Sequence, residues 1–324
     1  MARLVRPGLL IASLCYFTLC ILAGLEVNNI LHQVMVILFI LFGLIVVIRY
    51  LVLLIAAIRE KVKSKTEVKS TWSPSVSIIV PAFNEENLIE ASLESLAVLD
   101  YPDYEIIVVD DGSTDGTARL TNKVADRYQL NRISVISQSN SGKPWALNTG
   151  LLHAQGELVV CVDSDSRLNS EALKVGVKHF KDKQVGAVGG FVNIINNDSL
   201  ITKFQFLEYI IGQNFLRRGL SFFNIVTIVP GPIGMFRRKA IQQVGGFNTR
   251  EDCFAEDADL TVRLLTEGWR VKGETRMIAY TEAPVTLYTL LRQRYRWKRG
   301  VFQAYFDNFY RLITSPNIKG VVIA

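Results

Sequence analysis

Residues 157–165 read Glu-Leu-Val-Val-Cys-Val-Asp-Ser-Asp, and the organisation of the whole chain is clearest from here. Residues 158–162 are apolar and mostly β-branched, which predicts a buried strand, and two carboxylates, Asp163 and Asp165, follow it directly. In an open α/β sheet, ligands lie just beyond the carboxyl ends of the strands. A D-x-D at that place offers hard oxygen ligands to Mg²⁺ or Mn²⁺. The motif alone would favour an Asp-rich turn, and the neighbouring motifs reverse that preference.

The segments around this stretch alternate between strand and helix patterns. Apolar runs predict strands over 76–80, 104–109, 133–136 and 185–192, and helical spacing of apolar residues predicts helices over 87–97, 117–128 and from 141. Strands that alternate with helices of this length form βαβ units. We therefore predict an α/β fold with a Rossmann-like mixed, mainly parallel sheet flanked by helices.

A second polar motif, Asp-Asp-Gly-Ser-Thr-Asp-Gly over 110–116, follows the second predicted strand. Capping of the next helix is the simpler interpretation, because Asp or Ser satisfies free N–H groups at a helix start. Asp110 and Asp111 are nevertheless two carboxylates where one cap suffices, so a contact to a ribose or base is expected. The chain has neither G-x-G-x-x-G nor G-x-x-x-x-G-K-[ST]. A bound diphosphate would therefore be held by a metal ion and by Lys or Arg.

The composition points to a membrane surface rather than to nucleic acid. Of the 324 residues 49% are hydrophobic, the mean hydropathy is +0.24, and the net charge is +6. Basic residues lie beside apolar stretches, which suits anionic lipids or phosphates, and no DNA-recognition motif accompanies them. The four cysteines, Cys15, Cys20, Cys161 and Cys253, have no metal-ligand or disulfide spacing. A reduced, cytosolic environment is expected for the domain that follows.

Two apolar runs occupy the N-terminus, at 8–25 and 30–48, and each approaches the ~20 residues that cross a bilayer. Basic residues precede the first run and follow the second, whereas the loop at 26–29 has none. By the positive-inside rule we predict a transmembrane helical hairpin over 1–59 with both flanks in the cytoplasm, in the cell (inner or plasma) membrane. A cleaved signal peptide is the alternative for the first run, but its cleavage site is poor.

The remaining boundaries follow from shifts in composition. A basic linker is expected at 60–75, a cytoplasmic domain at 76–283, and an amphipathic interfacial helix at 284–313. Residues 314–324 are expected to begin a further membrane segment. The helical pattern at 199–218 is compatible with either a membrane-facing or a core helix.

Six motifs, taken in order, resemble the family 2 inverting glycosyltransferases, which have the GT-A fold. They are residues 80–86, 110–115, Gly142-Lys143 with Ala146-Leu-Asn148, Asp163-Ser-Asp165, Glu256-Asp257 and Gln293-Arg-Tyr-Arg-Trp297. The last motif is similar to that of the membrane-bound, mostly processive branch: cellulose, chitin, hyaluronan and poly-N-acetylglucosamine synthases. The resemblance covers roughly residues 75–311.

The resemblance implies a role for each matching residue of the nucleotide half. Pro81, Asn84 and Glu85 would lie by the uridine, and Asp110 or Asp111 would contact the uracil or ribose. Lys143 would lie near the nucleotide. Asp163 and Asp165 would hold the divalent cation, the diphosphate and the donor sugar.

The second half would then supply the acceptor side. Asp257, beside Glu256, would be the general base, although a helix N-terminus lowers a carboxylate pKa and a base needs a pKa near the working pH. Ala255 stands where the family usually has Thr. The resemblance also implies that Gln293, Arg296 and Trp297 would close the donor site. Trp297 would in addition lie under the acceptor sugar. The loop with Gly231 and Pro232 would line the acceptor pocket.

The implied activity is transfer of GlcNAc or Glc from a UDP-sugar to a growing β-linked polysaccharide, with Mg²⁺ or Mn²⁺. One alternative is a non-processive enzyme that glycosylates a polyprenyl phosphate or other lipid, giving a glycolipid. The other is a catalytically silent membrane scaffold of the same fold. Because similar synthases continue into further membrane helices, a missing C-terminal part or a membrane partner subunit is expected.

Overall fold

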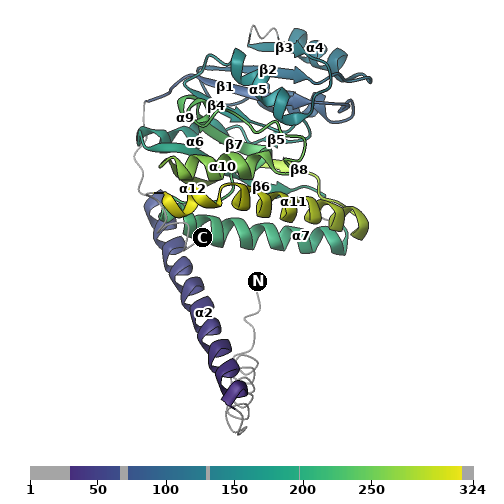
Figure 1. The fold of residues 1–324 in the computed structure, drawn as a ribbon. Helices are drawn as coiled ribbons and strands as arrows, with labels where there is room; N and C mark the ends of the chain where they lie inside the picture. The colour runs from purple at the N-terminus through teal and green to yellow at the C-terminus, as the bar shows by residue number, and fades with distance from the viewer. Residues whose placement is uncertain (1–29, 66–71, 129–131, 197, 316–324) are drawn as a thin grey trace. The chain divides into compact units, whose positions relative to one another are not determined.

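The computed structural model describes residues 30–65, 72–128, 132–196 and 198–315 (Figure 1). The first predicted membrane run, at 8–25, and most of the 314–324 segment lie outside the described residues. The chain divides into two compact units, 1–53 and 54–324.

The first described element is α2 (Ile30–Lys65), a helix of 36 residues. Its apolar sequence contains no proline, so it continues without a break through 51–58 and into the stretch expected as a linker. Among the described residues, α2 alone is long and apolar enough to cross a bilayer, by length and composition.

An eight-stranded mixed sheet forms the centre of the second unit, in the order β3-β2-β1-β4-β7-β6-β8-β5. The half containing β3, β2, β1 and β4 is parallel, as predicted, whereas β7 runs antiparallel to both of its neighbours. β6 pairs in parallel with β8, and β5 pairs antiparallel with it. The strands are β1 (Val76–Ala82), β2 (Tyr104–Asp110), β3 (Ile133–Ser137), β4 (Leu158–Cys161), β5 (Arg167–Leu168), β6 (Val185–Ile194), β7 (Gly234–Arg237) and β8 (Arg270–Thr281).

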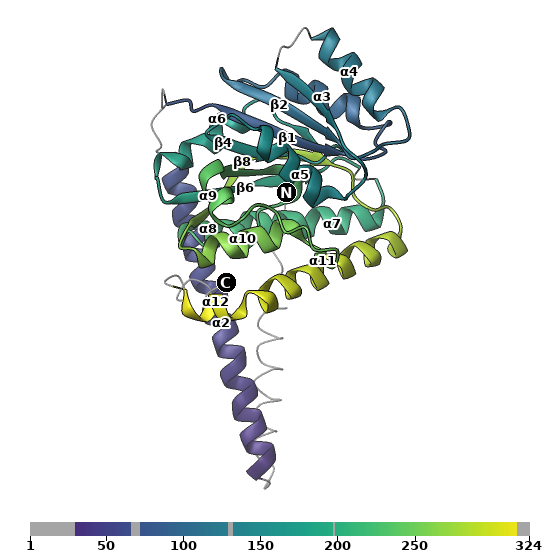
Figure 2. The same ribbon diagram turned by 45° about the horizontal axis from the view of Figure 1, so that its top comes forward.

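Helices cover both faces of this sheet (Figures 1 and 2). Because side chains alternate along a strand, Ile78 joins the core cluster on one face while Ile79 packs against Gly150 on the other. The helices are α3 (Ile89–Ala97), α4 (Thr117–Arg127), α5 (Lys143–His153), α6 (Ala172–Gly176), α7 (Leu200–Ile211), α8 (Arg218–Phe222), α9 (Arg238–Gln243), α10 (Glu256–Thr266), α11 (Leu287–Asp307) and α12 (Phe309–Thr314).

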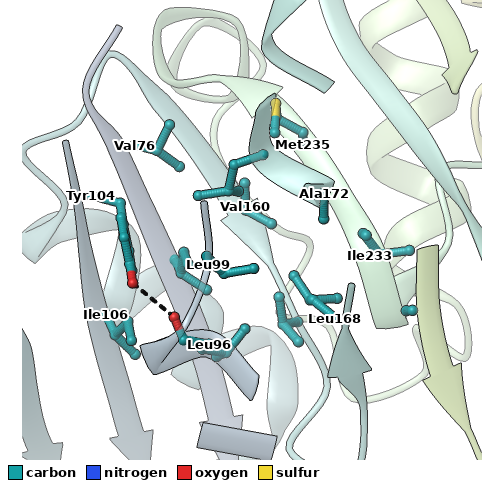
Figure 3. Packing of buried hydrophobic residues seen from close by; sticks show 14 of the residues in the cluster. Val76, Leu96, Leu99, Tyr104, Ile106, Val160, Leu168, Ala172, Ile233 and Met235 are labelled. Carbon is teal, nitrogen blue, oxygen red and sulfur yellow. Dashed lines mark hydrogen bonds between the residues drawn. The ribbon is translucent and has the colours of Figure 1, made fainter. Parts of the chain in front are cut away.

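The main core lies between the sheet and helices α3 and α6 (Figure 3). Val160 and Met235, from the neighbouring strands β4 and β7, are fully buried in it. Tyr104 is also buried, and its hydroxyl donates a hydrogen bond to the Leu96 carbonyl (3.0 Å). This core fixes the strands whose carboxyl ends support the polar motifs.

The helical pattern predicted over 199–218 forms α7, a π-helical turn at 212–217, and α8. α7 and α11 lie side by side in both views, joined by an Arg294–Glu208 ion pair (2.6 Å) (Figures 1 and 2). A stripe of apolar side chains on α7 is exposed rather than in the core: Leu200, Phe204, Leu207 and Ile211.

Candidate active site

The polar motifs meet at one edge of the sheet. β1, β2 and β4 are parallel neighbours, so the loops that follow them begin at the same edge. The first residue of α5, Lys143, and the first two of α10, Glu256 and Asp257, reach the same place. The structure thus brings together groups that are up to 172 residues apart, with Glu85 and Asp257 at the two ends of that range.

Lys143 is the central cation of this cluster. Its Nζ lies 2.7 Å from Asp163 Oδ1 and 2.8 Å from Glu256 Oε1. Burial opposes the charged amine, but the two carboxylates outweigh it and raise the Lys143 pKa well above its usual value. Burial alone would raise the Glu256 pKa. The nearby Lys143 outweighs burial and lowers this pKa, and the charge of Arg296 makes a smaller contribution in the same direction. Lys143 and Glu256 are therefore charged at neutral pH, and the Lys143 amine lies between the two carboxylates.

Asp257 differs from its neighbour Glu256 in its ionisation. Burial, followed by the negative charge of Glu256, raises the Asp257 pKa to about 6. This happens although Asp257 Oδ1 accepts a hydrogen bond from the Ala258 N–H at the helix start (2.8 Å). The helix start would lower the Asp257 pKa, but burial and the charge of Glu256 outweigh it. Asp257 can therefore take up a proton near neutral pH.

Gly231 closes the space between these groups. Its backbone N–H donates to Asp257 Oδ2 (3.3 Å). A Cβ at this position would lie 3.1 Å from Lys143 Nζ and 3.3 Å from Asp163 Oδ2, so a larger residue would require these two side chains to shift by a few tenths of an ångström. Gly231 therefore lies beside both the predicted base and the D-x-D aspartate, and with Pro232 it belongs to the short turn, Gly231–Ile233, before β7.

The two D-x-D carboxylates, Asp163 and Asp165, offer oxygen atoms of the kind that ligate a divalent cation. Burial and the charge of Asp163 raise the Asp165 pKa, and burial and Asp165 raise the Glu85 pKa. Carboxylates that repel one another in this way are stabilised by a cation. Within the described residues no three His, Cys, Asp or Glu side chains form a full metal site. Two carboxylates fit Mg²⁺ or Mn²⁺, because these ions take further ligands from water and from substrate phosphates.

Asp111 already has hydrogen-bond partners within the protein. This buried carboxylate accepts from Gln138 Nε2 (2.7 Å), the Ser141 N–H (3.0 Å) and the Gly142 N–H (2.7 Å). It therefore holds the loop that leads into Lys143, where Gly142 has a φ of +94° that glycine alone adopts easily. No sequence signal pointed to Gln138.

The other residues predicted to lie by the uridine form hydrogen bonds with their neighbouring loops. Asp110, also buried, accepts from the Ser113 N–H (3.1 Å), and Asn84 Oδ1 accepts from the Thr114 N–H (2.9 Å). Asn84 has a φ of +55° just beyond Pro81, which is part of β1. These contacts join the loop after β1 to the loop after β2.

The Gln293–Trp297 motif lies on α11, next to α7. The Arg294 guanidinium carbon lies 4.4 Å from the Trp297 ring centroid, and Trp297 also meets the Tyr209 ring at 6.4 Å. Arg296 is exposed and near enough to affect Glu256. Gln293 Oε1 is buried and accepts no hydrogen bond from the described part of the chain. An unpaired buried acceptor is costly, and a ligand donor would satisfy it.

Arg217, which lies in the π-helical turn, was not among the predicted site residues. Its guanidinium donates to the carbonyl of Gly190 and to Gln213 Oε1 (3.1 Å). Burial lowers the Arg217 pKa to about 10, and the charge of Asp257 partly opposes this.

A model of the family described as "Glycosyl transferase family 2" matches residues 77–245, more than half of the chain. The poly-beta-1,6-N-acetyl-D-glucosamine synthase of Staphylococcus aureus (strain MSSA476) is 30% identical over 254 residues, 78% of this chain and 61% of that protein. The Staphylococcus epidermidis enzyme of the same name is 28% identical, over 75% and 58% of the two chains. The chain thus spans about three fifths of the length of these relatives.

Solved structures give the same fold. The mannosyltransferase PcManGT from Pyrobaculum calidifontis, in complex with GDP-Man and Mn2+, aligns with a TM-score of 0.63 and 27% identity, covering 81% of this chain and 73% of that chain. S. aureus TarS, residues 1–349, aligns with a TM-score of 0.51 and 22% identity over 72% of each chain. Together they confirm the predicted mixed sheet flanked by helices.

Proposed function

The chain belongs to glycosyl transferase family 2, and from this premise we propose that it is a membrane-bound, inverting enzyme that transfers a sugar from a UDP-sugar to a growing β-linked polysaccharide. Glycosyl transfer is the activity of the family. The donor, the acceptor and the membrane attachment are the parts that we propose.

The observation that carries the proposal is the state of Asp257. A carboxylate with a pKa of about 6 is deprotonated at neutral pH yet still basic enough to accept a proton. We infer that Asp257 removes the proton from an acceptor hydroxyl as that oxygen attacks C1 of the donor sugar. Attack from the face opposite the leaving UDP inverts C1, so an α-linked donor gives a β-linked product.

The residues around Asp257 assist the departure of UDP. Lys143 and Arg296 supply positive charge at the edge where the diphosphate is proposed to lie, and Asp163 and Asp165 would hold the divalent cation that neutralises it when bound. Glu256 keeps Lys143 in place and raises the Asp257 pKa. Trp297 is proposed to lie under the acceptor sugar, and Gln293 Oε1 to accept a ligand hydrogen bond.

N-acetylglucosamine is the preferred donor sugar in this proposal. The similarity to the staphylococcal poly-beta-1,6-N-acetyl-D-glucosamine synthases supports it, and glucose remains the second sugar. A GDP-sugar is a second candidate donor, because the mannosyltransferase aligned above is 27% identical and was solved with GDP-Man.

Attachment to a bilayer is supported by two features. The described part of the chain contains one helix, α2, with the length and composition of a membrane span. The neighbouring α7 and α11 expose large apolar side chains beside basic ones, as interfacial helices do: Phe204, Leu207, Leu291, Tyr295, Phe302 and Phe306. We call this pair of helix surfaces the α7/α11 face.

The test is nucleotide release by membranes that contain the full chain, with Mn²⁺, Mg²⁺ or a chelator. The donors are UDP-GlcNAc, UDP-Glc and GDP-Man, with Asp165→Asn as the inactive control. The proposal predicts release with one UDP-sugar, lost with chelator and in the control. Product length then separates a polysaccharide synthase from a single transfer to lipid. Intact nucleotide binding without release from any donor would contradict the proposal and favour a silent scaffold.

A further inference from the structure

A cavity of about 500 Å³ lies outside the Lys143–Asp163–Glu256 cluster, between the start of α5 and the loop that precedes α10. Ser141, Gly142 and Trp145 line one wall, and Thr249, Arg250 and Glu251 line the other. Its volume is within the range of small-molecule sites, about 300–1,000 Å³. None of the roles above uses it.

The cavity lies on a different side of α5 from the reacting groups. Lys143 and Trp145 are two residues apart in the first turn of the helix, so their side chains point in directions that differ by about 200°. Lys143 reaches Asp163 and Glu256, whereas the Trp145 ring is half exposed at the cavity. A ligand here would thus lie on the opposite side of α5 from the Lys143 side chain.

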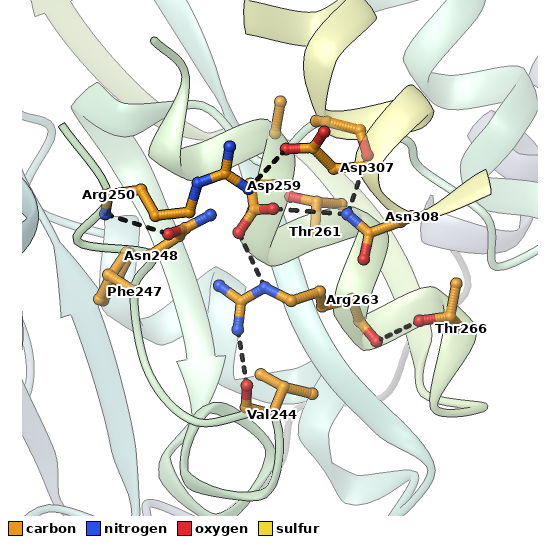
Figure 4. A network of polar contacts seen from close by, with 12 residues as sticks. Val244, Phe247, Asn248, Arg250, Asp259, Thr261, Arg263, Thr266, Asp307 and Asn308 are labelled. Atoms are coloured by element: carbon orange, nitrogen blue, oxygen red, sulfur yellow. Dashed lines mark hydrogen bonds and ion pairs between the residues drawn. The ribbon is translucent and has the colours of Figure 1, made fainter. Parts of the chain in front are cut away.

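Both walls are held firmly. Asn148 of α5 makes two hydrogen bonds with the backbone of Phe247, donating to its carbonyl (2.9 Å) and accepting from its N–H (2.8 Å). Arg250 pairs with Asp252 (2.7 Å) and with Asp307 at the end of α11 (3.1 Å) (Figure 4). These contacts order the residues around the cavity before a ligand binds. Binding should therefore cost little conformational entropy of the protein.

The chemistry of the walls favours an uncharged, hydroxyl-rich ring over an anion. Arg250 already faces two carboxylates, and Glu251 adds a negative charge, so a phosphate would gain little here. The hydroxyls of Ser141 and Thr249 offer hydrogen-bonding groups of the kind that sugars use. The face of an indole such as Trp145 stacks on the C–H groups of a pyranose.

We propose that this cavity is a saccharide subsite that holds a pyranose unit of the acceptor or product chain, outside the reaction centre, through stacking on Trp145. The inference rests on the proposed function, because a chain of sugars is the ligand expected beside this active site. The donor sugar is not the ligand, since it must lie next to Asp257, on the Lys143 side of the helix. A saccharide that stacks on Trp145 would account for the exposure of this large ring at the cavity.

The test measures saccharide binding by the full chain in detergent, without donor, so that it is independent of transfer. The probes are β-linked tetrasaccharides of N-acetylglucosamine and of glucose, titrated by calorimetry. Trp145→Ala should weaken binding about three- to tenfold, and Trp145→Phe less, because a ring remains. Leu152→Ala is the matched control, an exposed change on the same helix (84% exposed).

A UDP titration of the same variants completes the design. The expected result is that the UDP dissociation constant of Trp145→Ala stays within about twofold of that of the wild type. The proposal is overturned if neither tetrasaccharide binds the wild type, if Trp145→Ala binds the tetrasaccharides as tightly as Leu152→Ala, or if the loss appears in UDP affinity instead. Failure of the proposed function would differ, because the wild type would then release no nucleotide.

Discussion

Lys143 Nζ lies 2.8 Å from Glu256 Oε1, and this contact joins the first residue of α5 to the first residue of α10. The same amine contacts Asp163 after β4. One cation thus links the loop with the proposed metal ligands to the helix that carries the proposed base, Asp257. The two carboxylates also raise the Lys143 pKa, which keeps this amine charged at neutral pH.

Replacing this cation should affect activity more than stability. In Lys143→Met, Asp163 and Glu256 repel each other, and we expect the rate of sugar transfer to fall about 100-fold. Because 38% of the Lys143 side chain is exposed, water screens the pair, and the loss in unfolding free energy should be only about 1 kcal/mol. Turnover and melting temperature measure the two effects. Lys143→Arg keeps the charge and should lie between; equal activity in all three proteins would contradict the role.

The pKa of Asp257 predicts the acidic limb of the pH profile. The deprotonated form is the proposed base, so activity should be half-maximal near pH 6, nearly full about one unit higher, and fall about tenfold per unit well below pH 6. Asp257→Asn should lower turnover by a factor of about 100 to 10,000, with UDP affinity nearly unchanged. Glu256→Gln removes a negative neighbour and should move the limb to lower pH. An unchanged limb in Glu256→Gln would show that another group titrates.

Asp111 should act by positioning the loop before Lys143. In Asp111→Asn, one oxygen that accepts from Gln138, Ser141 or Gly142 becomes a donor, and the loop loses at least one hydrogen bond. We expect turnover to drop about tenfold with a smaller change in KM for the donor. Asp126→Asn, an exposed change on α4, is the control. A loss confined to nucleotide affinity would indicate direct contact with the uracil or ribose instead.

A buried carboxylate far from the proposed chemistry should control acid stability. Burial would raise the Glu274 pKa, but hydrogen bonds from His179 (3.1 Å) and Arg276 (2.8 Å) outweigh it and lower the pKa to about 2. A depressed pKa stabilises the fold above the unfolded value, about 4.5, and that stability is lost as the pH falls toward 2. Glu274→Gln should therefore cost about 3 kcal/mol at pH 7 and less at pH 3.

Thermal melts of the detergent-solubilised chain at the two pH values check this expectation. Glu267→Gln, at an exposed position, provides the matched control and should melt like the wild type at both. A Glu274→Gln deficit that is equally large at pH 3 would show that lost packing, rather than charge, is responsible.

The α7/α11 face should contact lipid. Single cysteines at Phe204 and Phe306, carrying a fluorophore in a background without the native cysteines, should be quenched by brominated lipids in phosphatidylglycerol-containing vesicles. Leu152 is more exposed than Phe204 or Phe306, but it lies on α5, and a cysteine there should not be quenched. Equal quenching at the three positions, or none, would refute the assignment of this face to the bilayer.

The local features of the fold could be predicted from the sequence because they depend on neighbours in the chain. The apolar run before Asp163, the alternation of strands and helices and the order of the six motifs are such features, and they led to the correct fold and family. A parallel sheet then requires that loops such as those at Asp110 and Asp163 share one edge. Even the α2 helix followed from composition, although its continuation through Lys65 did not.

Partners and ionisation states were decided by tertiary packing alone. The sequence does not predict that Lys143 forms an ion pair with Glu256, 113 residues away. It also does not predict that Asp111 accepts hydrogen bonds from Gln138 and from the Gly142 N–H. The helix position of Asp257 by itself suggests a low pKa, and only burial beside Glu256 reverses it. Electrostatic energies depend on distance and on exclusion of water, and both are properties of the folded chain. The wall of a cavity at Trp145 is, for the same reason, visible only in three dimensions.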